Sequence, residues 1–275
     1  MKHITVRRNF VEGECHPFFF WGDWHVGDAA CAKGELAKDR ETIRTTPNSL
    51  YANMGDNGDF IAPDGDRRFR ADRLDRDLFD IGNLDELGDV QVDWLSEFEA
   101  PVIDRCVCQL GSNHPNKFDQ KHQTNTMKRK LKTMGGAELA DRVWAPAMAL
   151  VQLLFTDEHG HACEVQLNLH HGSHTGDADM LLKKLRMKLR FWPTVDVMAR
   201  GHCHHLRQTH EPRMVIDRRN TRERERQVYA ILTGGYGKTF EGGYAEAGDF
   251  DPIDIGMARL DIFPSRYGAR LEVVT

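Results

Sequence analysis

The chain has 275 residues, 40% hydrophobic and 29% charged, which is typical of a globular protein with its own core. Its 37 lysines and arginines against 42 aspartates and glutamates give a net charge of −5, so no global basic field attracts nucleic acid or a membrane surface. No apolar stretch approaches the roughly 18 residues of a membrane span, the residues after Met1 lack a signal-peptide core, and the six cysteines form no CxxC pair. We expect a single domain over residues 1–275, in the cytoplasm and without a membrane partner.

Five short apolar runs, each leading into glycine and a residue that can bind a metal, mark the chain up to residue 204. In chain order they cover residues 18–21, 50–54, 103–110, 165–169 and 195–199. Runs of this length that are punctuated by glycine predict strands whose carboxyl ends carry functional loops.

Amphipathic helical patterns separate these runs, and strand patterns dominate the end of the chain. The helical patterns cover 89–100, 122–134, which is basic, and 179–191. In the strand-rich part, 211–275, the expected strands cover 213–216, 227–233, 256–263 and 270–274. Strands alternating with helices, followed by a strand-rich half, predict an α/β fold with two packed sheets flanked by helices.

Two other kinds of segment have simple structural explanations. Segments 66–77 and 217–226 mix charges of both signs, which favours solvated faces or a hairpin loop, with substrate-phosphate binding as the alternative. The GGYGKT sequence at 234–239 is not a nucleotide phosphate loop, because the spacing G-x4-G-K-[ST] requires glycine where the chain has Leu232. We expect tight turns near a site there.

The residues at the ends of the apolar runs form a candidate metal constellation. Its elements are Asp23-x-His25, Asp56, Asn113-His114, His170-His171 and His202-x-His204. Imidazole and carboxylate ligands suit Mn, Fe, Zn or Ni better than Ca or Mg. In an extended backbone, residues i and i+2 point to the same side, so each D-x-H or H-x-H pair can bind one ion. Each element alone is weak evidence, but five at the ends of predicted strands indicate a metal site.

In this order the elements resemble the calcineurin-like metallophosphoesterase family. The family patterns D-x-H, GDxxD, GNH[DE], H-G and GHxH appear here as GDWHVGD (22–28), GDNGD (55–59), GSNHP (111–115), HHG (170–172) and GHCH (201–204). This resemblance implies a four-layer α/β/β/α double β-sandwich. LTGGYG (232–237) and EGGYAEAGDFDPIDIG (241–256) are also similar to the tails of phage-type members, whose compartment is the host cytoplasm.

The resemblance implies two divalent transition-metal ions, with Mn expected first and Fe, Zn or Ni as alternatives. The first ion takes Asp23, His25 and His204. The second takes Asn113, His202 and either His170 or His171, of which the H-G pattern favours His171. Asp56 bridges both ions. Such a pair generates a bridging hydroxide near neutral pH and binds phosphate oxygens.

The resemblance also implies two catalytic residues outside the ligand set. His114 is the histidine that protonates the leaving oxygen, and Asp59 is the carboxylate that orients it. The GNH[DE] loop departs from the family pattern, because Ser112 replaces the glycine and Pro115 the acid. Asn113 and His114 are retained, so the departure concerns the conformation of this loop and not metal binding.

The expected function is a dinuclear metal-dependent phosphoesterase, and the expected partner is a phosphate-ester substrate. A phosphodiester is favoured, with nucleic acid or a nucleotide as a candidate that the net charge of −5 does not support. The alternatives are a phosphomonoesterase or phosphoprotein phosphatase, and a catalytically silent binding or scaffold protein. The sequence leaves the oligomeric state open.

Overall fold

Two mixed β-sheets form the centre of the protein in a computed structural model, which describes residues 1–63, 66–79, 84, 86–173, 176–217, 222–240, 246 and 252–275. Within these residues, the first sheet has the spatial order β1 (Lys2–Asn9), β6 (Met148–Thr156), β7 (Ala162–His170), β8 (Val197–Arg200), β10 (Arg222–Thr233) and β9 (Leu206–Asp217). The second has the order β12 (Gly268–Val274), β11 (Ala258–Ser265), β2 (His16–Trp21), β3 (Leu50–Asn53), β4 (Cys106–Leu110) and β5 (Trp144–Ala145).

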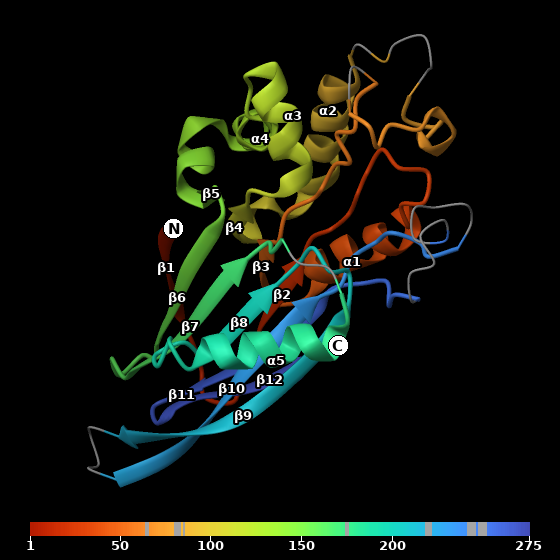
Figure 1. The fold of residues 1–275 in the computed structure, drawn as a ribbon. Helices are drawn as coiled ribbons and strands as arrows, with labels where there is room; N and C mark the ends of the chain where they lie inside the picture. Colours follow the sequence, from red (N-terminus) through yellow and green to blue (C-terminus); the bar gives the residue numbers. More distant parts are fainter. Residues whose placement is uncertain are drawn as a thin grey trace.

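Helices cover the outer faces of both sheets, which confirms the four-layer α/β/β/α architecture (Figure 1). The helices are α1 (Lys33–Thr45), α2 (Leu87–Glu99), α3 (Asn113–His122), α4 (Thr126–Val143) and α5 (Ala178–Leu189), with short 3₁₀ helices at Ala71–Arg73 and Ala100–Arg105. The central core lies between the sheets and includes Phe18 and Phe20 of β2 and Leu167 and Leu169 of β7. A second core joins α1, α2 and α4 to the outer face of the second sheet, and a third joins α5 to β8 and β10.

The polarity of the strands explains why the motif loops gather at one edge. In the second sheet, β2, β3, β4 and β5 pair in parallel, and in the first sheet β7, β8 and β10 do so. The carboxyl ends of neighbouring parallel strands meet at the same edge of a sheet. The loops that follow β2, β3, β4, β7 and β8 therefore come from both sheets to one region of the molecule.

Several elements differ from the sequence-based prediction. The predicted strand 103–110 begins only at Cys106, because Ala100–Arg105 is a 3₁₀ helix with Pro101 in its first turn. The predicted helix 122–134 begins at Thr126, where Asn125 caps it, and non-helical backbone at Gly135 and Gly136 interrupts α4. Strands β1, β5 and β6 and helices α1 and α3 were not expected.

The last strands are longer than their apolar patterns predicted. β9 and β10 pair antiparallel over 12 residues each, with Leu206 opposite Thr233 at one end and Asp217 opposite Arg222 at the other. The two strands project away from the end of the molecule that carries α3 and α4 (Figure 1). The charged segment 217–226 thus belongs to a hairpin with Glu223 and Glu225 exposed, as predicted, although 218–221 lie outside the described residues. In the described part of the chain, no helix has both the length and the apolar character needed to cross a membrane.

Candidate metal centre

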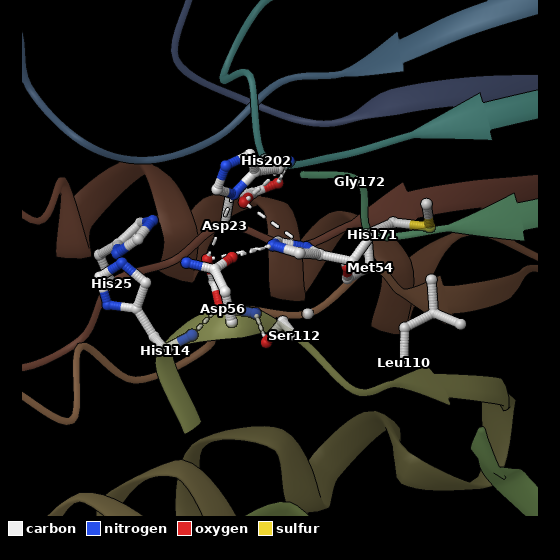
Figure 2. A network of polar contacts seen from close by, with 12 residues as sticks. Asp23, His25, Met54, Asp56, Leu110, Ser112, His114, His171, Gly172 and His202 are labelled. Atoms are coloured by element: carbon white, nitrogen blue, oxygen red, sulfur yellow. Dashed lines mark hydrogen bonds and ion pairs between the residues drawn. The ribbon is translucent and has the colours of Figure 1, made fainter. Parts of the chain in front are cut away.

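The loops that follow five strands bring the predicted metal and catalytic residues into one cluster. Asp23 and His25 follow β2, Asp56 and Asp59 follow β3, Asn113 and His114 begin α3 after β4, His171 follows β7, and His202 and His204 follow β8. Figure 2 shows Asp56 between His25 and His114 on one side and His171 on the other. Three groups in this cluster have ligand atoms that all lie within 4.8 Å of one another: Asp23–His25–His204, His25–Asp56–His114 and Asp56–His171–His202.

The backbone at these residues is not extended, so the reason given for the D-x-H and H-x-H pairs was wrong. The φ angles are 53° at Asp23, 52° at His25, 44° at Asp56, 69° at His202 and 56° at His204. A left-handed backbone is unfavourable for residues other than glycine and concentrates at functional sites. The side chains of each pair therefore converge through strained turns after the strands, instead of through the alternation of a strand.

The first ligand group consists of Asp23, His25 and His204. Nε2 of His25 lies 3.1 Å from Nε2 of His204. Nε2 of His204 lies 3.7 Å from Oδ1 of Asp23, which is fully buried. Both carboxylate oxygens of Asp23 accept hydrogen bonds from the backbone N–H of His202, which joins the β2 loop to the β8 loop. Two imidazole nitrogens that face each other require a proton or a cation between them.

The second group contains His171, Asn113 and His202, and His171 is oriented for it. Nδ1 of His171 donates to the backbone carbonyl of Met54 at 2.8 Å, which leaves Nε2 facing Oδ1 of Asn113 at 2.9 Å and Oδ2 of Asp56 at 3.1 Å. A metal-binding histidine characteristically donates its other ring N–H to a carbonyl in this way. Nδ1 of His170 instead accepts a hydrogen bond from the backbone N–H of Gly172.

Asp56 connects the two groups and provides the test of whether a metal fits. Its Oδ1 accepts the backbone N–H of His114 at 3.1 Å, at the amino end of α3, where an anion is favoured. Its buried Oδ2 lies 3.1 Å from Nε2 of His171 and 3.9 Å from Nδ1 of His202. A buried carboxylate oxygen among imidazole nitrogens is a donor set that fits a divalent transition metal.

The electrostatics of the cluster favour cations. Burial lowers the pKa of His25, but Asp59, Asp56 and Asp23 outweigh it and raise that pKa to about 9. Burial also opposes the protonation of His171, yet Asp56 and Asp23 raise its pKa to about 9. Without a metal, the buried carboxylates thus retain protons on two predicted ligands. A divalent ion has to displace these protons, because a histidine ligand binds in its neutral form.

His114 differs from the predicted ligands because its Nε2 faces the guanidinium group of Arg68. Nδ1 lies 2.8 Å from the carbonyl oxygen of Asp59 and 3.1 Å from its Oδ1, so it donates to Asp59. Nη1 of Arg68 lies 3.3 Å from Nε2 and donates to it. Asp59 also lies 3.4 Å from Nδ1 of His25, and hydrogen bonds from both histidines lower its pKa even though burial opposes this.

The altered GSNHP loop is well formed. The Oγ of Ser112 accepts the backbone N–H of Asp56 at 2.7 Å, so the serine that replaces glycine fixes the loop that carries the central carboxylate. Pro115 lies in the first turn of α3, where a missing N–H breaks no helical hydrogen bond. Both departures from the family pattern are therefore compatible with the arrangement of the site.

Glycines allow the close approach of these loops. A Cβ at Gly201 would lie 2.6 Å from Oδ2 of Asp23, and one at Gly55, whose φ is 101°, would lie 2.7 Å from Cβ of Ser112. The 234–239 segment also borders the site, since the N–H of Tyr236 donates to the carbonyl of Asp23 at 2.9 Å. The segment thus lies near the site, as expected, but it forms isolated bridges at Gly235 and Gly237 where tight turns were expected. Most of the 241–256 tail lies outside the described residues.

Sequence reasoning missed two residues that support this cluster. Arg68, from the segment expected to be a solvated face, contacts His114. Lys130, from a helix expected only to be basic and amphipathic, is fully buried against Glu99 beside the Asp56 loop. The mixed charges of 66–77 carried a weak signal for Arg68, but nothing in the sequence pattern marked Lys130.

Comparisons with known proteins add only distant structural relatives. No protein-family model and no curated protein matches the chain. It aligns with a conserved uncharacterized protein of Streptococcus pneumoniae, a predicted phosphoesterase, at 12% identity over 95% of this chain and 90% of that one, with a TM-score of 0.35. It aligns with Vps29 of Entamoeba histolytica, complexed with Zn²⁺, at 13% identity over 94% of this chain and 98% of that one, with a TM-score of 0.33. It aligns with GAP50 of Plasmodium, the anchor in the inner membrane complex, at 10% identity over 95% of this chain and 84% of that one, with a TM-score of 0.44. Functional assignment therefore rests on the residues of the site.

The His170-His171 doublet provides a direct test of the ligand geometry. His171→Ala is expected to remove one of two bound Mn²⁺ ions, because Nε2 of His171 faces Asp56 and Asn113. His170→Ala is the matched control and should keep both ions, since its imidazole bonds the backbone of Gly172. Calorimetric titration with Mn²⁺ and elemental analysis give the stoichiometry. Loss of an ion from His170→Ala alone would transfer the ligand role to His170.

Proposed function

We propose that the protein is a dinuclear metal-dependent phosphoesterase of the calcineurin-like type, and that its preferred substrate is a phosphodiester. The observation that carries this proposal is the position of Asp56, whose carboxylate belongs to two candidate ligand groups, one with His25 and one with His171 and His202. The phage-type subfamily is part of the proposal on sequence resemblance alone. A reducing cytoplasm is the proposed compartment, which suits six cysteines that form no disulfide.

The residues of the chain have separate tasks in this proposal. Asp23, His25 and His204 would bind one ion, Asn113, His171 and His202 the other, and Asp56 both. Two divalent ions at such a site supply a nucleophilic water at neutral pH and stabilise the charge on the phosphoryl oxygens. The side chains of His204 and His202 are 28% and 18% exposed, while Asp23 and Asp56 are buried, so substrate would approach from the histidine side.

His114 is the proposed proton donor to the leaving oxygen. Its Nδ1 bonds Asp59, which fixes the ring and leaves Nε2 as the atom that can face the substrate. Asp59 is the positioning residue for His114. A catalytically silent scaffold has no need for this second histidine–carboxylate pair, and the well-formed GSNHP loop favours an enzyme over such a scaffold.

The decisive experiment measures metal content and hydrolysis on the same sample. Protein freed of metal with a chelator and titrated with Mn²⁺ is expected to bind two ions and to hydrolyse bis(4-nitrophenyl) phosphate faster than 4-nitrophenyl phosphate. A preference for the monoester would assign the chain to the phosphomonoesterases. Two bound ions without hydrolysis of either ester would contradict the proposed activity.

The role of His114 predicts a dependence on the leaving group. His114→Asn is expected to lower hydrolysis of an alkyl phosphodiester by roughly 10²–10⁴, because its basic alkoxide needs a proton. Hydrolysis of a nitrophenyl diester should fall only modestly, since the phenolate leaves without one. Metal content should stay near wild type, and Asp59→Asn should show a weaker form of the same pattern. Equal losses on both esters would show that His114 stabilises the phosphoryl group instead.

A further inference from the structure

Arg68 occupies a position beside the proposed proton donor that the proposed chemistry does not explain. Its Nη1 donates to Nε2 of His114 at 3.3 Å. Nδ1 on the opposite side of the ring bonds Asp59, so a leaving oxygen that receives a proton from His114 must lie at Nε2. Whatever is attached to that oxygen extends past Nε2, which is the region where Arg68 lies.

Asp66 fixes the guanidinium in this place. Its Oδ1 accepts both the backbone N–H and Nε of Arg68 at 3.0 Å, and its Oδ2 accepts Nη2 at 2.6 Å. A bidentate carboxylate contact of this kind sets the plane of an arginine side chain. Arg68 is therefore preorganised although its side chain is 32% exposed.

The hydrogen bonds of Arg68 leave capacity for an anion. Of its five N–H donors, the contacts with described residues use one on Nε and one on Nη2 for Asp66 and one on Nη1 for His114. One donor on each terminal nitrogen remains, which is enough for two hydrogen bonds to phosphate oxygens. The hydrogen bond from Arg68 is the main cause that lowers the pKa of Asp66 to about 2. The positive charge of Lys117 in α3 also contributes, which shows that a second cation lies nearby.

The contact with His114 also has to break during the reaction. Nε2 cannot donate a proton to the leaving oxygen while it accepts one from Nη1 of Arg68. An anionic group on the substrate provides oxygens to which Nη1 can turn, and this frees Nε2 to take up from solvent the proton that it then donates to the leaving oxygen. A neutral leaving group offers no such replacement.

We propose that Arg68 binds a second phosphate, carried by the leaving alcohol of the substrate. This inference rests on the proposed function and deepens it, because it specifies a phosphodiester whose leaving side carries an additional phosphate. Arg68 is then a specificity-determining residue. It contacts the substrate without binding either metal.

The test compares two thymidine dimers, TpT and pTpTp, of which the second has a phosphate on each terminal hydroxyl. Whichever P–O bond of the central diester breaks, the leaving nucleoside of pTpTp then carries an additional phosphate. The Mn²⁺-loaded wild type is expected to show a KM for pTpTp at least roughly 10-fold below that for TpT, as for a charge-assisted hydrogen bond. Arg68→Met should raise the KM for pTpTp by roughly 10- to 100-fold and so remove the preference of the wild type for pTpTp over TpT. Arg68→Lys should recover part of the preference. Arg67→Met, at the exposed neighbouring residue, should match wild type.

Calorimetry separates this inference from the proposed hydrolysis. Wild type is expected to bind thymidine 3′,5′-bisphosphate at least roughly 10-fold more tightly than thymidine 5′-phosphate, and Arg68→Met to lose that difference. This result would support the second phosphate site even if neither dimer were hydrolysed, in which case only the proposed function would fail. Equal affinities in wild type, or equal losses on both dimers in Arg68→Met, would overturn the site. If Arg68→Met unfolds early in a thermal scan, the same comparison with Arg68→Lys decides.

Discussion

Asp56→Ala is expected to lower phosphodiester hydrolysis by about 10³-fold or more and to reduce the bound Mn²⁺ from two ions to at most one. Oδ2 of Asp56 is the buried oxygen that faces His171 and His202, and Oδ1 accepts the N–H of His114. No other described carboxylate belongs to two of the candidate ligand groups. Its loss removes several kcal/mol of metal-dependent charge stabilisation, and each 1.4 kcal/mol corresponds to a factor of ten.

Two further variants show that charge, and not volume, causes this effect. Asp56→Asn keeps the shape of the side chain but removes the negative charge, so it should lose nearly as much activity and metal. Asp77→Asn removes a carboxylate that is 90% exposed and should match wild type. Rate measurement after chelation and Mn²⁺ readdition, with elemental analysis, checks all three. Wild-type turnover in Asp56→Ala would contradict the dinuclear centre.

The sequence was sufficient to predict the layers because the apolar runs of the central strands are nearly uninterrupted. Phe18, Phe20 and Trp21 of β2 are fully buried between helices and the facing sheet, as their pattern predicted. Strand β1 was missed because it is an edge strand with mostly exposed, polar side chains, among which only Ile4 is buried. The true length of β9 and β10 was missed because backbone pairing extends that hairpin beyond the apolar residues.

The membership of the candidate site was predictable, but its geometry was not. The motif residues were visible because histidine, aspartate and glycine recur at strand ends. The left-handed backbone at Asp23, His25 and Asp56 was not visible, because nothing in a D-x-H sequence distinguishes it from an extended one. Arg68 was ambiguous for a related reason, since its approach to His114 depends on how the loop after β3 folds back, which the mixed charges of 66–77 do not determine.

Lys130 was hidden because a lysine in a basic amphipathic helix is normally solvated. Here it is fully buried, and its ammonium group donates to Glu99, to Oε1 of Gln109 at 2.8 Å and to Oδ1 of Asn57 at 3.3 Å. The other oxygen of Glu99 accepts Tyr51 at 2.8 Å and Asn53 at 3.1 Å. Asn53 and Asn57 flank Asp56 in the chain, so this network supports the loop of the candidate metal centre.

The second large effect is therefore expected from Lys130→Met, which should lower the free energy of unfolding by about 3–5 kcal/mol. Methionine fits the apolar stem of lysine but leaves the buried carboxylate of Glu99 without its cation. For a chain of this size, the loss corresponds to a decrease in Tm of roughly 6–20 °C. Differential scanning calorimetry of the metal-free protein measures it without interference from metal binding.

Two controls distinguish the buried pair from an ordinary lysine contact. Lys128→Met, on the same helix, breaks an ion pair with Asp141 in which the side chains are 36% and 70% exposed, so it should cost at most about 1 kcal/mol. Lys130→Met combined with Glu99→Gln removes both charges and should recover about half of the loss or more, because no buried charge is left unpaired. A double variant as unstable as Lys130→Met would show that the lost hydrogen bonds to Asn57 and Gln109, and not the uncompensated charge, account for the instability.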